Sequence, residues 1–175
     1  INGIPVCTAS NPQFNPEVVS DGANGAIIAW MDERNGGETD NGYFNDLYAQ
    51  RVSSAGSTLW ATDGVPFAPT DRKIQYPIDS PMRLVSDGEG GAIGCWQDDL
   101  LSGVTGVKIQ KLDADGNRAW GIYPEVVAPS IYAVSSPWMP ALCADGAGGA
   151  VVAWFELATG SCAGLRGQRI TREGG

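Results

Sequence analysis

The chain has 175 residues, 43% of them hydrophobic, and a formal net charge of −9 at neutral pH. This length is enough to bury one substantial core, and the excess of acidic groups repels phosphate backbones, which argues against nucleic-acid partners. The sequence contains no histidine and no apolar run long enough to cross a bilayer, so a Ser–His–Asp triad is excluded and no membrane insertion is expected.

The first predicted element is a strand over residues 1–9, INGIPVCTA. This segment matches TDGVPFAPT at 62–70, which follows a turn and closes a group of strands. We therefore predict that residues 1–9 are an outer strand separated from the sheet to which they belong.

Residues 10–70 carry the first complete unit, with four predicted strands. The first strand ends in DGANG (21–25), a tight turn whose glycine and asparagine residues tolerate positive φ. AIIAW (26–30) is apolar at every position, which is typical of a strand buried on both faces. The third strand is LYAQRV (47–52), and it turns through SSAGS into the fourth, VPFAP (65–69).

The unit then recurs twice, over residues 71–130 and 131–175. The copies VVSDGANGAIIAW, LVSDGEGGAIGCW and LCADGAGGAVVAW keep one spacing from aspartate to tryptophan. Such a fixed period indicates stacked copies of one supersecondary unit. The repeated tryptophans are therefore expected in the core between units; they are Trp30, Trp96, Trp154, Trp60 and Trp120.

A repeated four-stranded antiparallel unit with a doubly buried inner strand is typical of a β-propeller blade. We predict an all-β chain of three blades, the last of which lacks its outer strand after Gly174. Another all-β repeat fold is the alternative. Closed propellers have about four to eight blades, so we expect the chain to associate with itself or with further blades, by exchange of residues 1–9 into a third blade.

The repeats resemble a family of secreted bacterial propeller-like repeats. The resemblance is carried by SDGANGAIIAWMDER, DLYAQRV and GSTLW and covers nearly the whole chain. It implies an extracellular or cell-surface location and a propeller-like architecture. It implies no particular chemistry.

The four cysteines have no CxxC spacing, and their even number suits an oxidising compartment. If the third and fourth strands pair so that Ala68 lies near Phe44, the equivalent residues Cys7 and Cys162 face each other. We therefore predict a Cys7–Cys162 disulfide, within one chain or between chains. Cys95 and Cys143 either pair or pack as small apolar groups. Four free thiols are the alternative.

The loops from second to third strand and from fourth to first strand vary in length, whereas the other turns are uniform. The variable loops share one end of a blade, which is the predicted ligand face. Aromatic side chains there can stack on sugar rings or pack within the loops. The ligand-binding candidates at this end are Phe14, Asp32, Arg34, Tyr43, Tyr76, Asp98, Tyr132 and Trp138.

The longest loop, 32–46, is rich in acidic residues. Its Glu38, Asp40 and Asp46 are candidate Ca²⁺ ligands because hard cations prefer carboxylate and carbonyl oxygens. The alternative is a solvated acidic loop, and no other cofactor is expected.

One acid stands two residues after the strand tryptophan in every unit: Asp32, Asp98 and Glu156. Paired carboxylates can hydrolyse glycosides. An acid repeated in every unit is, however, expected to be structural, bonding turn amides or a cation such as Arg34.

These patterns favour a non-catalytic, secreted binding or adhesion module that recognises a glycan or a surface protein. A structural subunit joined by strand exchange is the alternative, and a glycosidase-type enzyme is the third hypothesis.

Overall fold

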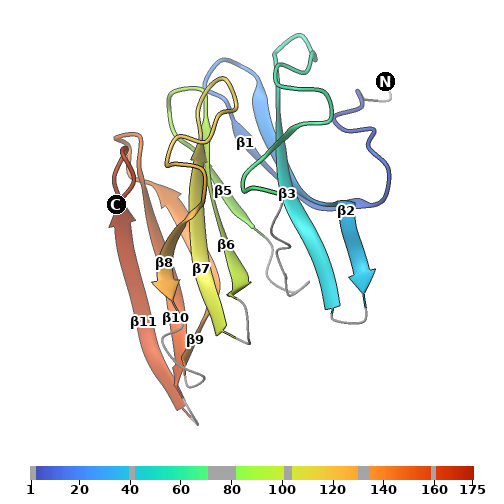
Figure 1. Cartoon of the computed structure of the whole chain (residues 1–175). Coiled ribbons are helices and arrows are strands. Elements are labelled where there is room, and N and C mark those ends of the chain that lie inside the picture. Colours follow the sequence, from blue (N-terminus) through green and yellow to red (C-terminus); the bar gives the residue numbers. More distant parts are fainter. Residues whose placement is uncertain (1–2, 40–41, 71–81, 101–103, 130–134, 159–160) are drawn as a thin grey trace.

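The protein consists of three antiparallel β-sheets that lie side by side, as the computed structural model in Figure 1 shows. The structure describes residues 3–39, 42–70, 82–100, 104–129, 135–158 and 161–175. This part of the chain contains no helix, so the predicted all-β class is confirmed. No helix long and apolar enough to cross a membrane occurs among these residues.

Each sheet corresponds to one sequence repeat, and its strands follow one another in chain order. The first sheet contains β1 (Gln13–Ser20), β2 (Ala26–Thr39), β3 (Gly42–Val52) and β4 (Val65–Pro66). The second contains β5 (Arg83–Ser86), β6 (Ala92–Leu100), β7 (Val104–Leu112) and β8 (Glu125–Pro129). The third contains β9 (Ser135–Ala144), β10 (Ala150–Ala158) and β11 (Ser161–Ile170).

The predicted hairpin turns are held by their aspartates. In the first repeat the Asp21 carboxylate accepts hydrogen bonds from the backbone N–H groups of Ala23 and Gly25, both at 2.8 Å. Asp87 and Asp145 make the same pair of bonds in their own repeats. The invariant spacing therefore reflects a side chain that closes each turn, as short polar residues commonly do.

A buried glutamine ties the third strand to the connection that follows it. Gln50 accepts a hydrogen bond from the Trp60 backbone N–H at 2.9 Å and donates one to the Ala61 carbonyl at 2.8 Å. Gln110 does the same at Trp120 and Gly121. The glutamine that recurs in the sequence thus positions a tryptophan at the boundary of each of these two sheets.

Two apolar cores hold the array together, one at each boundary between sheets. The first core joins residues of β2 and β3 to Leu84, Ala92 and Trp96 of the second sheet. The second core joins Ile93 and Ile109 to residues of the third sheet. Trp60 and Trp96 belong to the first core and Trp120 and Trp154 to the second, so the predicted position between repeats is confirmed for these four. Trp30 is buried but belongs to neither core.

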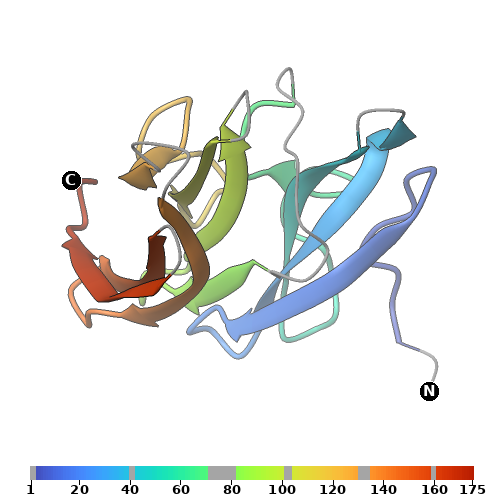
Figure 2. The ribbon, with the colours of Figure 1, turned by 90° about the horizontal axis from the view of Figure 1, so that it is seen from below.

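The third sheet has three strands in the order β11–β10–β9, so β11 forms one of its edges. Residues 3–9 add no strand to it; they lie beside the first sheet, where Asp63 accepts a hydrogen bond from the Thr8 backbone N–H. Figures 1 and 2 place this arm and β11 at opposite ends of the array. The exchange of residues 3–9, the described part of this arm, into the third sheet therefore does not occur within one copy.

Candidate functional site

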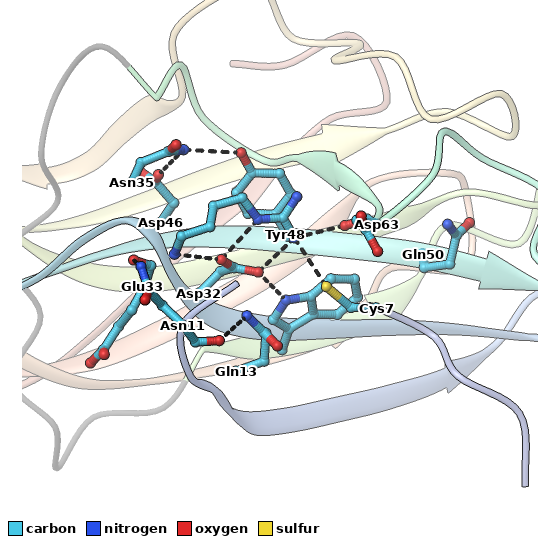
Figure 3. Close-up of polar contacts among 12 residues, drawn as sticks. Cys7, Asn11, Gln13, Asp32, Glu33, Asn35, Asp46, Tyr48, Gln50 and Asp63 are labelled. Carbon is cyan, nitrogen blue, oxygen red and sulfur yellow. Dashed lines mark hydrogen bonds and ion pairs between the residues drawn. The ribbon is translucent and has the colours of Figure 1, made fainter. Parts of the chain in front are cut away.

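Asp32 is the centre of a buried polar cluster at the loop end of the first sheet (Figure 3). Its side chain is fully buried and accepts hydrogen bonds from the Trp30 indole at 2.7 Å and from the Arg34 backbone N–H at 2.9 Å. The Arg34 guanidinium also forms an ion pair with it at 2.6 Å. Burial by itself would raise the pKa of Asp32, but these bonds outweigh it and hold the pKa below its usual value.

Asp46 lies opposite Asp32 across the β2–β3 pair. Its carboxylate accepts a hydrogen bond from the Asn35 amide at 2.9 Å. Burial dominates here, and the pKa of Asp46 is raised. The two facing acids thus differ in the partner that compensates for their burial: Asp32 has a cation and Asp46 has a neutral amide.

Arg34 joins this cluster to the arm formed by residues 3–9. Its guanidinium stacks over the Tyr48 ring, 3.7 Å from the ring centroid. One of its nitrogens donates hydrogen bonds to the Asp63 carbonyl at 2.8 Å and to Cys7 Sγ at 3.2 Å. The predicted binding residue Arg34 therefore fastens two segments of its own chain to the first sheet.

The other two repeats place a cation where the first has Tyr48. In the sequence alignment Lys108 and Arg166 are the equivalents of Tyr48. Lys108 forms an ion pair with Asp98, and Arg166 forms one with Glu156. All three repeated acids are therefore bound to a cation of their own sheet, which agrees with the structural role expected from their repetition.

Of the aromatic candidates, only Phe14 has a described side chain, so the predicted aromatic surface stays a prediction. Phe14 lies opposite Met31 on β1 and packs against the first core. The backbone of Trp138 pairs with Phe155, and that of Tyr43 with Glu38, but their side chains are not described. Tyr76 and Tyr132 lie outside the described residues.

The calcium hypothesis rests mostly on residues that the structure does not place. Asp40 is outside the described part, and of Glu38 only the backbone pairing is given. Among the described residues no group of three or more carboxylates or cysteines is arranged to hold a metal ion. Calcium binding by the 32–46 loop therefore stays a prediction.

The cysteine pairing predicted from register is wrong for this single chain. Cys95 is buried in the second core and Cys143 is exposed on β9, and both are free thiols. Cys7 is also free and contacts Arg34. Within one chain Cys7 cannot pair with a residue of β11, because the arm and β11 lie at opposite ends of the array. The register assumed for the prediction also differs, since the Phe67 N–H donates to the Leu47 carbonyl and Ala68 does not reach Phe44.

Two contacts at the sheet boundaries were not predicted from the sequence. The Trp60 indole donates a hydrogen bond to the Ala114 carbonyl of the second repeat at 3.0 Å, and its ring lies against Gly116, where a side-chain carbon would come within 3.0 Å. Trp120 makes the same contacts with Arg172 and Gly174 of the third repeat. The sequence contained one indication of these contacts: the spacing from Gly56 to Trp60 is the same as that from Gly116 to Trp120.

Basic residues complete both boundaries. Arg51 donates to the Ala114 carbonyl at 3.2 Å, and its equivalent Lys111 donates to the Gly148 carbonyl at 3.0 Å. Both also form ion pairs with the turn aspartate of their own repeat. Each boundary therefore combines an apolar core, a tryptophan on a glycine and a cation bound to a carbonyl of the next repeat.

No known protein family, curated protein or solved structure matches this chain.

Proposed function

We propose that the chain is a non-catalytic binding module of a secreted, propeller-like repeat protein. In this proposal each sheet is one blade, and the variable loops at one end form the face that recognises a glycan or a surface protein. The observation that carries the non-catalytic assignment is the pairing of Asp32, Asp98 and Glu156 with cations of their own sheets. A glycosidase needs carboxyl groups that reach the sugar, and Asp32 and Asp46 are buried.

The loop end of the first repeat supports a recognition role. β2 continues to Thr39, whereas β6 ends at Leu100, which corresponds to Arg34 in the first repeat. The first hairpin therefore extends beyond the second at this end of the array. Loops that vary in length on a constant scaffold are the usual place for recognition residues.

A panel of immobilised glycans tests this proposal. We expect binding by the unmodified chain and about a fivefold loss of affinity for Trp138→Ala, because one aromatic residue stacked on a ligand contributes on the order of 1 kcal/mol. Leu59→Ala is the matched control, since Leu59 is 51% exposed in the connection between the third and fourth strands, at the other end of the sheet. Equal binding by the two variants would contradict the assignment of Trp138 to the ligand face.

A structural subunit of an extracellular assembly is the second candidate function. It is favoured by the position of β11 at the edge of a three-stranded sheet. An edge strand presents backbone donors and acceptors that can pair with another strand.

A further inference from the structure

The two boundaries inside the chain are the same interface used twice. At the first boundary Ile27 and Leu47 are buried against the second sheet, with exposed fractions of 0% and 1%. At the second boundary their sequence equivalents Ile93 and Val107 are completely buried against the third sheet. One face of each repeat is therefore built to be covered by the next repeat.

The same face of the third sheet is open. Its equivalents of those residues are Val151, which is 37% exposed, and Leu165, which is 81% exposed. The strand register places Ala153 and Phe155 on this face as well, because Phe155 pairs with Leu165 and Ala153 with Gly167. A continuous apolar face of this kind marks an interaction surface.

The cation of this third interface is also in place. Arg169 is the sequence equivalent of Arg51 and Lys111. Its side chain is 60% exposed and binds the turn aspartate of its own repeat, Asp145, at 2.7 Å. Arg51 and Lys111 make that bond and also bind a carbonyl of the next repeat, whereas the described contacts of Arg169 include no such carbonyl.

At the other end of the array, the first sheet carries the complementary face. Trp30 occupies the position of Trp96, which receives Phe67 of the preceding repeat in an edge-to-face contact with ring centroids 6.4 Å apart. Val18, which is 63% exposed, and the half-buried Ile28 lie opposite each other on the same face as Trp30. This face therefore has the residues that the second and third sheets use to receive a neighbour.

The arm of residues 3–9 lies where the fourth strand of a preceding repeat would lie. Gly3 has a φ of 69°, as its equivalent Gly64 has a positive φ of 90°. Ile4 lies beside Gly56, just as Val65, the equivalent of Ile4, lines a groove with Gly116. The arm thus packs on its own first sheet in the way that β4 packs on the second sheet.

We propose that the open face of the third sheet binds the first sheet of a second copy of this chain. The arm of the second copy then lies beside β11 as its fourth strand and completes that sheet. By equivalence with the β3–β4 register, Ile4 of the second copy lies opposite Gly167 and Pro5 opposite Arg166. Arg169 of the first copy donates a hydrogen bond to a carbonyl of the second copy, that of Asn24 or Ser54. These residues are the equivalents of Gly148 and Ala114, which accept from Lys111 and Arg51.

The two internal boundaries specify a repeat of this type as the occupant, and the first sheet of a second copy is such a repeat. A partner of unrelated shape would have to match a twisted face, a strand edge and one cation together, and the first sheet already presents the matching set. The contact joins unlike surfaces, so it is heterologous and runs head to tail. This inference deepens the assembly alternative above and does not depend on ligand binding by the loops.

Cross-linking between two singly substituted chains tests the register. Ile4→Cys and Gly167→Cys are made separately in a background in which Cys7, Cys143 and Cys162 are serine, and the two chains are mixed under mild oxidation. Gly167 tolerates the change, because the nearest atom to its added carbon is 3.4 Å away. We expect a covalent dimer only in the mixture. Leu59→Cys in place of Ile4→Cys is the control, and a dimer of equal yield with it, or no dimer at all, would overturn the proposal.

Sedimentation of the unmodified sequence tests the face. We expect concentration-dependent association that Leu165→Glu weakens at least tenfold, since it buries a charge in an apolar interface. Leu165 is exposed in one copy, so this variant should fold normally, which circular dichroism checks. Ile122→Glu is the matched control, because Ile122 is 67% exposed but lies off this face. A monomer at every concentration, or equal effects of the two changes, would refute the proposal.

The two proposals fail separately. Glycan binding by the monomeric Leu165→Glu chain would support recognition by the loops whatever the outcome of cross-linking. A specific cross-link without any glycan binding would support assembly alone.

Discussion

At the scale of single residues, the first repeat differs from the other two in the cation that pairs with its repeated acid. Every repeat buries or half-buries an acid two residues after its inner-strand tryptophan. The second and third repeats supply a cation from the neighbouring strand, whereas the first supplies Arg34 from the same strand and stacks it on Tyr48. The first repeat has Tyr48 where the other repeats have Lys108 or Arg166, so its acid is paired with Arg34 instead. Arg34 also binds Cys7 and the Asp63 carbonyl, and it thereby holds the arm on the first sheet.

The Asp32–Arg34 pair predicts an acid-dependent loss of stability. The folded-state pKa of Asp32 lies below the usual 3.8, so its stabilising contribution is complete above that value and is lost as the pH falls through the folded-state pKa. We expect Asp32→Asn to lower the free energy of unfolding by roughly 3 kcal/mol at pH 7, as for a broken buried ion pair. Urea titrations from pH 7 to pH 2 should show the difference from the unmodified chain shrinking only below about pH 4.

Glu33→Gln is the control for this titration, because Glu33 is adjacent to Asp32 but outside the ion pair. It should leave the stability at pH 7 nearly unchanged. A difference between Asp32→Asn and the unmodified chain that is independent of pH would show that packing, rather than charge, accounts for the loss.

Burial gives Cys95 and Cys143 different reactivities toward an alkylating reagent. Burial raises the pKa of Cys95 to about 12, and the thiolate is the reactive form, so iodoacetamide at pH 8 should leave Cys95 unmodified. The exposed Cys143 should react under the same conditions. Peptide mass spectrometry measures both sites, and denaturant should remove the difference. Rapid labelling of Cys95 in the folded chain, or a Cys95–Cys143 disulfide, would contradict the structure.

At the scale of elements, a glycine in one turn receives a tryptophan from the repeat before it. Gly116 has a φ of 84°, and its missing side chain leaves space for the Trp60 ring. Gly174 receives Trp120 in the same way. These glycines are therefore required both by the backbone of the turn and by the packing between sheets.

A matched pair of substitutions separates the two requirements. Gly88 has a φ of 78°, close to that of Gly116, but no atom lies within 4 Å of the position its side chain would take. Gly88→Ala should cost only the backbone strain, about 1–2 kcal/mol. Gly116→Ala should cost clearly more, because the added carbon would displace Trp60. Equal losses in thermal unfolding would show that the ring packs elsewhere.

The core position Trp96 provides the scale for such losses. Trp96 is completely buried and meets Phe67 edge to face, so Trp96→Ala should lower the free energy of unfolding by roughly 3–5 kcal/mol. Trp138→Ala, placed in the ligand face by hypothesis, should leave stability almost unchanged. Denaturant unfolding of both variants measures the contrast, and equal destabilisation would remove Trp138 from the site.

The repeat pattern was sufficient to predict the strands, because Asp–Gly turns and the Gly56-type turns mark both ends of each hairpin. It could not predict exposure. AVVAW in β10 is as apolar as AIIAW in β2, yet Val151 is 37% exposed while Ile27 is buried, since burial depends on the presence of a following sheet. The strand register was also predicted incorrectly. The Cys7–Cys162 pairing was inferred from the equivalent strands β4 and β3, and their register is not determined by the pattern of side chains.

The pairing of Asp32 with a cation could be predicted from the sequence, whereas the contacts of Arg34 with Tyr48 and Cys7 could not. A buried acid needs a cation, so a partner of the Arg34 type for Asp32 could be expected. The stacking of Arg34 on Tyr48 and its reach to Cys7 depend on the fold of a distant segment, and nothing in the local sequence indicates them.

At the scale of the whole molecule, stability is a sum over sheets and the boundaries between them. The third sheet is covered on one face only, whereas the second is covered on both. In such quasi-linear arrays each unit depends on its nearest neighbours. The third sheet is therefore expected to open locally before the second.

Hydrogen exchange can locate this opening. Trp120→Phe keeps a ring on Gly174 but removes the indole bond to the Arg172 carbonyl, 2.8 Å long. A lost hydrogen bond costs about 1 kcal/mol, so we expect amide exchange in β9, β10 and β11 to accelerate about fivefold. Trp60→Phe, which removes the equivalent bond to Ala114, should not produce this local effect. Uniform acceleration over all sheets by Trp120→Phe would show that the array unfolds as one unit.

The opposite placement of the arm and β11 has a mechanical consequence. A tensile load applied between residue 3 and residue 175 enters at one side of the array and leaves at the other (Figures 1 and 2). The two boundaries between sheets then bear that load in series, so the weaker boundary sets the force at which the array first yields. The chain should therefore lengthen in discrete steps, one repeat at a time.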